Sequence, residues 1–131
     1  MKKSILLFAI ILAGSQLKAQ DIFNKWEALN DFHLIMSQTF HPAEQDNLNP
    51  IKTKSQDLFA KAELLAKSEV PTDYKTEPIM SAVAQLQKDS KALNSLVEGK
   101  TATDEEIKKS LYDLHDVFHK IVGLCNGEDH E

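Results

Sequence analysis

The sequence predicts an all-α protein, an up-down-up-down antiparallel four-helix bundle, and three observations lead to this prediction. Apolar residues recur at spacings of 3 and 4 in four segments of similar length, which is the period of a helix with one buried face. The chain contains only 4 Gly and 4 Pro, and each proline stands at or near a boundary of a helical segment. No segment shows the strict alternation of a half-buried strand. Because the connections are short, the one-sided helices must pack against one another as antiparallel neighbours.

The first helix is expected over residues 21–41. Pro42 disfavours helical geometry at the residue before it, so the helix should end at His41. Its inward positions are spaced 4, 3, 4, 3, 4, and a histidine takes one of them. These positions are Ile22, Trp26, Leu29, His33, Met36 and Phe40.

The second helix is expected over residues 50–67 and the third over 77–98. Asn49 is predicted to cap the second helix, with Pro50 in its first turn. Thr76 or Glu77 begins the third helix, and Gly99 is predicted to cap its C-terminus. The inward residues are Ile51, Ser55, Leu58, Ala62 and Leu65 in the second helix, and Ile79, Val83, Leu86, Ser90, Leu93 and Val97 in the third.

The fourth helix is expected over residues 104–125. Thr103 and Glu106 form the sequence pattern of a capping box, which places acidic residues at the positive end of the helix. The apolar stripe again has spacings of 4, 3, 4, 3, 4, and the last residues, 128–131, are predicted to be a polar tail. The stripe consists of Ile107, Leu111, Leu114, Phe118, Ile121 and Cys125.

Residues 1–19 have the three-part pattern of a secretory signal peptide. A cationic start is followed by an apolar run that is too short to span a bilayer, and Ala19 is a small residue at the expected cleavage site. We therefore predict an exported protein, periplasmic or secreted, with residues 20–131 as a single domain that does not insert into the membrane. Removal of the leader takes away three lysines and no acid, which changes the net charge from −5 to −8.

Composition also excludes several classes of function. All 15 basic residues are lysines, so the chain has no arginine for forked contacts to phosphate or guanine, and no nucleic-acid partner is expected. One Cys excludes an internal disulfide framework and a Cys-based zinc ribbon, and Cys125 is expected to be protected by burial at the helix end. No Ser-His-Asp pattern or phosphate loop is present, so the protein is not expected to be an enzyme. The sequence indicates no particular protein partner.

Histidines are the compositional exception, because five occur in this short chain. His115 and His119 are four residues apart and should share one face of the fourth helix. The first and fourth helices are expected to be antiparallel neighbours. If Cys125 lies at the same height along the bundle as Ile22, then His115 lies at the height of about residue 32. His33 and His115 should therefore meet, with His119 one turn away. Three such imidazoles are suited to Zn²⁺, Cu²⁺ or Ni²⁺ in a bundle, and zinc is favoured.

His41 lies eight residues beyond His33, about 12 Å along the helix axis. It is expected to cap the C-terminus of the first helix as a cation. Alternatively, it joins the metal site or forms a weaker site with Glu44. The predicted metal ligands are thus His33, His115 and His119, with His41 as a weaker candidate. In the competing interpretation, all of these histidines are structural.

The chain resembles the soluble periplasmic b-type cytochromes, four-helix bundles related in shape to cytochrome c-prime. The similarity covers most of residues 22–122 and is sharpest at residues 26–31 and 118–120. The resemblance implies an exported bundle, a haem-ligating role for His119, and positions lining the haem face for Leu29 and His33. Trp26 stands where the family has its methionine ligand, and tryptophan cannot ligate iron, so the chain resembles a haem-less relative. It is also similar to exported hypothetical proteins with Thr-Phe-His-Pro and Leu-His-x-x-Phe-His segments.

Three functions follow as hypotheses. The first is an exported bundle that stores, buffers or senses a divalent transition metal. The second is haem-b binding through His119, with His33 or an open position opposite it. The third is a non-catalytic interaction module in which the histidines are structural.

Overall fold

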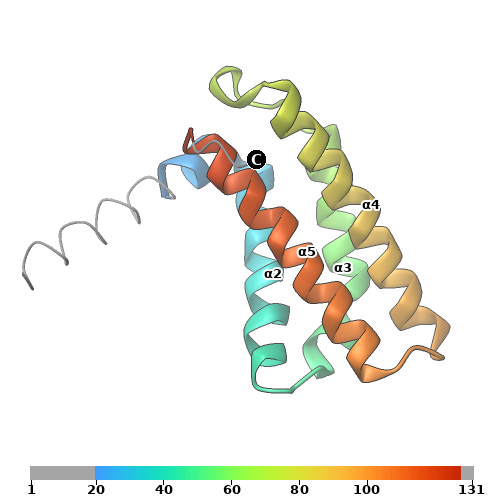
Figure 1. Cartoon of the computed structure of the whole chain (residues 1–131). Coiled ribbons are helices and arrows are strands. Elements are labelled where there is room, and N and C mark those ends of the chain that lie inside the picture. The colour runs from blue at the N-terminus through green and yellow to red at the C-terminus, as the bar shows by residue number, and fades with distance from the viewer. Residues whose placement is uncertain (1–19, 128–131) are drawn as a thin grey trace, which may run out of the picture.

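The computed structural model describes residues 20–127, and this part of the chain is an all-α up-down bundle (Figure 1). A short 3-10 turn, η1 (Thr72–Tyr74), joins the second main helix to the third. The four main helices are α2 (Glu27–Glu44), α3 (Asn49–Lys67), α4 (Glu77–Gly99) and α5 (Asp104–Cys125). The predicted leader, residues 1–19, and the predicted tail, residues 128–131, lie outside the described residues. No described helix has the length and apolarity required to cross a membrane.

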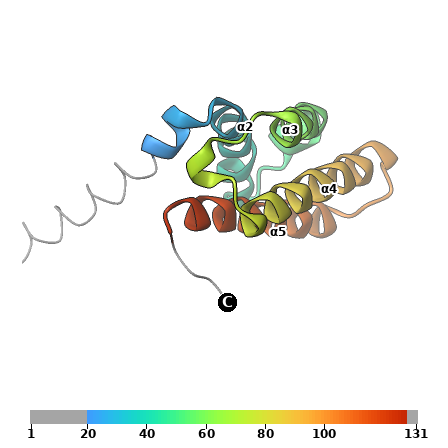
Figure 2. The same cartoon turned by 90° about the horizontal axis from the view of Figure 1, so that it is seen from above.

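Each main helix packs extensively against its neighbour in sequence. Seen from above, α2 and α3 form one side of the molecule, and α4 and α5 form the other (Figure 2). The remaining interface, between α2 and α5, is much less extensive than the three others. The bundle is therefore well closed on three sides and more open along the fourth.

Trp26 breaks the helix that was predicted over residues 21–41. Residues 20–25 are helical, but Trp26 has φ −126° and ψ 85°, and α2 begins at the next residue. The indole is only 2% exposed, and its Nε1 donates a hydrogen bond to Ser68 Oγ at 3.1 Å. Burial of this large ring at the end of α3 thus competes with continuation of the local helix.

The predicted end of the first helix is also wrong, because α2 continues through Pro42 to Glu44. Proline has no backbone N–H, so one hydrogen bond of the helix is lost. Because Pro42 lies in the last turn of α2, this loss affects little of the helix. Ala43 is fully buried, and the Pro42 carbonyl accepts the N–H groups of Gln45 and Asn47. Tertiary burial here outweighs the local preference of the residue before a proline.

Two predicted caps are replaced by their neighbours. Asn49 does not cap α3; it is the first helical residue, and its N–H donates to Asn47 Oδ1 at 3.2 Å. Gly99 remains helical, while Lys100 takes the left-handed conformation with φ 57°. The caps at Thr76 and Thr103 are confirmed, since their hydroxyl oxygens accept the N–H groups of Ile79 and Glu106.

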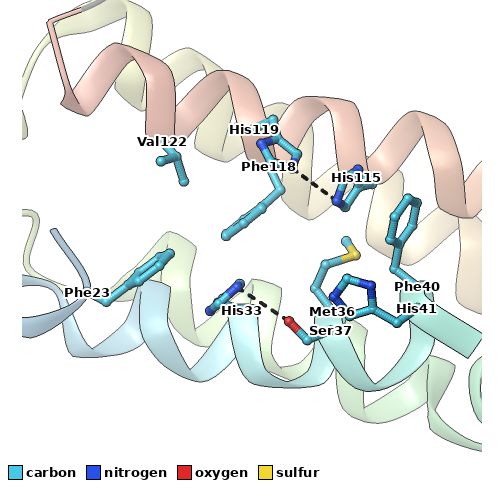
Figure 3. Close-up of a pocket in the computed structure, with 10 residues that line it drawn as sticks. All are labelled: Phe23, His33, Met36, Ser37, Phe40, His41, His115, Phe118, His119 and Val122. Carbon is cyan, nitrogen blue, oxygen red and sulfur yellow. Dashed lines mark hydrogen bonds between the residues drawn. The ribbon is translucent and has the colours of Figure 1, made fainter. Parts of the chain in front are cut away.

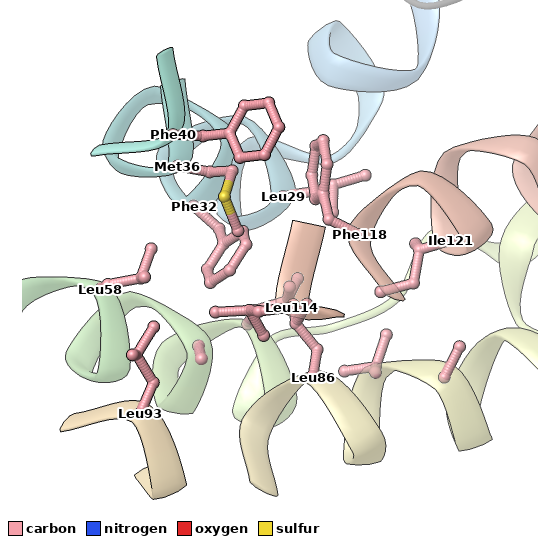
Figure 4. Close-up of a cluster of buried hydrophobic side chains, with 14 of the residues drawn as sticks. Leu29, Phe32, Met36, Phe40, Leu58, Leu86, Leu93, Leu114, Phe118 and Ile121 are labelled. Carbon is pink, nitrogen blue, oxygen red and sulfur yellow. The ribbon is translucent and has the colours of Figure 1, made fainter. Parts of the chain in front are cut away.

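The core follows the predicted stripes in α3, α4 and α5, with the outer ends Val97 and Cys125 only partly buried. In α2 the prediction is wrong at one position, because Phe32 is fully buried while His33 is half-buried. Leu29, Met36 and Phe40 are buried as predicted, so the error concerns only which of two adjacent residues turns inward. Figure 4 shows Phe32, Met36 and Phe118 converging with Leu114 in this core.

Candidate metal site in the cleft between α2 and α5

A cleft of about 340 Å³ occupies the open side of the bundle (Figure 3). Its walls come from α2, from α5 and from the helical turn at residues 20–25. All four predicted metal ligands line it, together with aromatic and apolar side chains. The lining residues are Phe23, His33, Met36, Ser37, Phe40, His41, His115, Phe118, His119 and Val122.

Aromatic rings fix the orientation of two of these histidines. The ring of His115 stacks on Phe40 with centroids 3.6 Å apart and planes within 3°. The ring of His33 is parallel to Phe23 at 4.5 Å and to Phe118 at 5.4 Å. Both imidazoles are therefore held in the cleft wall by flat apolar neighbours, and both are half-buried.

His115 and His119 form a close pair, as their spacing on α5 predicts. Their Nε2 atoms are 3.1 Å apart, and the two rings are inclined by 70°. Because an uncharged imidazole has one donor and one acceptor nitrogen, one ring of a neutral pair donates to the other. The pair thus presents two ring nitrogens to the same small volume at the cleft edge.

On α2, two hydrogen bonds involve the histidine rings. His41 Nδ1 donates to Glu44 Oε1 at 3.1 Å, and both side chains are exposed. His33 Nε2 lies 3.4 Å from Ser37 Oγ. His33, Ser37 and His41 therefore follow one another along the face of α2 that is opposite His115 and His119 (Figure 3).

The expected register between the first and last helices is wrong. His115 packs on Phe40 rather than lying level with residue 32, and His33 packs on Phe118. His33 and His115 therefore do not meet at one height. The count took Ile22 as level with Cys125, but Ile22 belongs to a separate turn before the break at Trp26, so it does not measure distance along α2.

Burial and neighbouring rings make protonation of the cleft less favourable. Burial lowers the pKa of His33 below 6.5, and the nearby His119 and His41 lower this pKa further. Burial also lowers the pKa of His115, and His119 adds to this effect. Asp116 and Glu44 partly oppose the lowering of the pKa of His115. At neutral pH both rings are therefore uncharged, which is the form that binds metals.

The cleft does not hold a complete set of metal ligands in its present arrangement. Within residues 20–127, no three His, Cys, Asp or Glu side chains are placed so that they could hold one ion together. The pair on α5 is already close, so a third protein ligand requires rotation of a side chain. Cys125 is not in the cleft; burial raises its pKa to about 11, which disfavours the metal-binding thiolate.

The aromatic walls are the part of the site that sequence reasoning missed. The sequence pattern predicts no role for Phe23 and only a core position for Phe40, although both lie against histidines. One pattern pointed to this arrangement: three cleft histidines directly follow a phenylalanine, at residues 32–33, 40–41 and 118–119. Adjacent residues of a helix lie about 100° apart, so a core phenylalanine places the next histidine at the core boundary.

A scan against protein-family models and searches of curated proteins and of solved structures find no match to this chain.

Proposed function

We propose that this protein binds a divalent transition metal ion in the cleft between α2 and α5, with His115 and His119 as ligands. The observation that carries the proposal is the 3.1 Å separation of their Nε2 atoms. Two nitrogens at about 2.0–2.1 Å from a tetrahedral zinc ion lie roughly 3.3–3.4 Å apart. The two nitrogens therefore need to move only a few tenths of an ångström to hold an ion, and the ring that donates between them must carry its proton on Nδ1 instead.

The surroundings of His115 also favour a neutral ligand. The pKa of His115 is lowered by burial, and stacking on Phe40 keeps its ring in one plane. Metal ions bind the unprotonated ring, so the lowered pKa of His115 reduces competition between the proton and the ion. Zn²⁺ is the first candidate, with Cu²⁺ and Ni²⁺ next, because imidazole suits all three ions.

The proposed role is binding for storage, buffering or sensing in an exported protein, without catalysis. Residues 1–19 support export through the pattern of a signal peptide. Two ligands on one helix, with further imidazoles on the facing helix, suit an ion that is taken up and released. The acidic chain supports no proposal of a nucleic-acid partner.

Calorimetric titration of Zn²⁺, Cu²⁺ and Ni²⁺ into protein purified without a histidine tag tests this function. His115→Ala and His119→Ala should each weaken binding strongly. Lys109→Ala is the matched control, because its exposed ion pair with Asp113 lies on α5 outside the cleft. Unchanged stoichiometry and affinity in both histidine variants would refute the proposal, as would the absence of binding heat for all three ions. The second result would leave the histidines with a structural role.

Haem-b binding is the second candidate, and the apolar character of the cleft favours it. The volume of the cleft is at the lower end of the ~300–1,000 Å³ range that is typical of ligand pockets. Its apolar lining includes Met36, Phe40, Phe118 and Val122. His119 at its edge would be the axial ligand, as the likeness to b-type cytochromes implies. A Soret band in purified or haem-titrated protein, lost in His119→Ala, is the expected result. Lack of a band under both conditions removes this candidate.

A further inference from the structure

The cleft lies where the first and last main helices are least closely packed, so an ion bound there can touch both. The α2–α5 interface is the sparsest of the four in the bundle. His115 and His119 supply nitrogens from α5, and two histidines of α2, His33 and His41, stand across the cleft (Figure 3). They are about 12 Å apart along the axis, so one ion is expected to recruit one of them.

His41 has a nitrogen prepared for a metal. Its Nδ1 is 3.1 Å from Glu44 Oε1, and an ionised carboxylate only accepts hydrogen bonds. The proton of a neutral His41 ring is therefore on Nδ1, which leaves the lone pair on Nε2. A carboxylate that holds the far nitrogen of a histidine is the usual support behind a metal ligand, because it sets the tautomer and raises the basicity of the ring.

His33 is less well prepared. Its ring is stacked in parallel with Phe23 and Phe118, and Ser37 Oγ is already 3.4 Å from its Nε2. Turning this ring toward an ion would disrupt both aromatic contacts, which stabilise its present position. His41 is exposed and touches Phe40 only edge-on, at 6.0 Å between ring centroids, so its ring can turn at lower cost.

We infer that His41, oriented by Glu44, is the third protein ligand, and that the ion joins α2 to α5 through His41, His115 and His119. This inference rests on the proposed function and assigns its ligands. His33 then forms part of the aromatic wall, and the fourth position is left for water or a small ligand. Three imidazoles with one open position form a zinc set of the type that retains an exchangeable ligand.

Titration of Zn²⁺ into single variants of the full chain separates the two α2 histidines. His41→Ala and Glu44→Ala should each lower the affinity on the order of tenfold or more. His33→Ala should lower the affinity much less than His41→Ala, and Leu34→Ala, on the same helix but outside the cleft, is the matched control. His41→Gln is a second variant that keeps a polar side chain at this exposed position, and circular dichroism checks that every variant retains its helices.

Electron paramagnetic resonance of the Cu²⁺-loaded protein counts the nitrogen ligands of the ion. A substitution that only lowers the stability of the fold does not change this number. The wild-type spectrum should show coupling to three nitrogens, and His41→Ala should show two. Loss of affinity in His33→Ala with no change in His41→Ala would overturn this inference and leave the metal function intact. Binding that depends on His115 and His119 but on neither α2 histidine would also overturn it. Absence of metal binding by the wild-type protein would refute the proposed function itself.

Discussion

The imidazole of His115 and the ring of Phe40 stack face to face, with centroids 3.6 Å apart and planes within 3°. This contact connects α5 to α2 at the level where the core ends and the cleft begins. Phe40 is 8% exposed, so one residue contributes both to the core and to the site. The Phe40 ring thus gives His115 a rigid apolar surface to pack on, at the α2–α5 interface, which is the least extensive of the four.

Phe40→Leu should destabilise the protein by about 1–1.5 kcal/mol, because a smaller apolar side chain keeps most of the burial but loses the ring stack. Urea unfolding, followed by the fluorescence of Trp26, the single tryptophan, measures the loss. Leu34→Ala serves as a surface control, since Leu34 is 51% exposed and should change the stability by no more than about 0.5 kcal/mol. Equal effects of the two substitutions would contradict the importance of the stack.

Acid should destabilise the metal-free protein from a pH of about 6.5 downward. The pKa values of His33 and His115 are lower in the folded chain than the ordinary value of 6.5. About one pH unit or more above this value, both rings are neutral in both states, and the shifts contribute nothing. As the pH falls, the unfolded chain takes up protons first, so stability falls until the folded protein is protonated as well.

Urea midpoints between pH 7.5 and 5.5, measured with a chelator present, test this pH dependence. The double variant His33→Gln/His115→Gln should show a flatter profile than the wild type over this range. The surface carboxylates are common to both proteins, so they cancel in the comparison. A wild-type profile as flat as that of the double variant would show that the two histidines are not responsible.

Two buried serines should respond in opposite directions to removal of their hydroxyl groups. Ser55 Oγ donates to Asn94 Oδ1 at 2.9 Å, so Ser55→Ala leaves a buried oxygen unpaired and should cost about 1–3 kcal/mol. Ser90 is also buried, but among residues 20–127 its Oγ has no hydrogen-bond partner. Ser90→Ala should therefore raise the free energy of unfolding by about 1 kcal/mol. Thermal unfolding of both variants measures the contrast, which a loss of stability in Ser90→Ala would contradict.

The cap of α5 should contribute more than the cap of α4. Thr103 Oγ1 accepts the N–H of Glu106 at 3.1 Å, whereas Thr76 Oγ1 accepts the N–H of Ile79 at 3.4 Å. Thr103→Ala is expected to cost about 1 kcal/mol, and Thr76→Ala less, because the longer hydrogen bond is weaker. Chemical denaturation of both variants tests the order, and a larger loss in Thr76→Ala would reverse it.

Local patterns predicted most of the helical structure. The inward stripes of α3 and α5 correspond to the buried residues, apart from the end at Cys125, because a helix with one apolar face has one way to remove that face from water. The threonine caps were also predicted correctly, because each depends on a hydrogen bond between residues three apart. The errors lie where a distant group competes with local preference. At Trp26 the competitor is the hydroxyl of Ser68, 42 residues away.

The structure places the four histidines of the predicted site around one cleft, but not at the relative levels that the sequence predicts. The spacing of His115 and His119 alone placed them on one helix face, and the structure brings their nitrogens to 3.1 Å. The level of His33 depended on a count along a helix that is interrupted. The hydrogen bond between His41 and Glu44 joins residues three apart, but its relevance to a metal depends on the position of α5.

The amino-acid sequence alone predicts four amphipathic helices, their antiparallel order and a histidine pair on the last helix, because each of these depends mainly on nearby residues and short connections. The tertiary structure decided where the first helix breaks, how α2 and α5 are aligned, and which rings stack on which histidines. These features depend on side chains that are far apart in sequence and compete for the same buried space. The local period of a helix carries no information about the outcome of that competition.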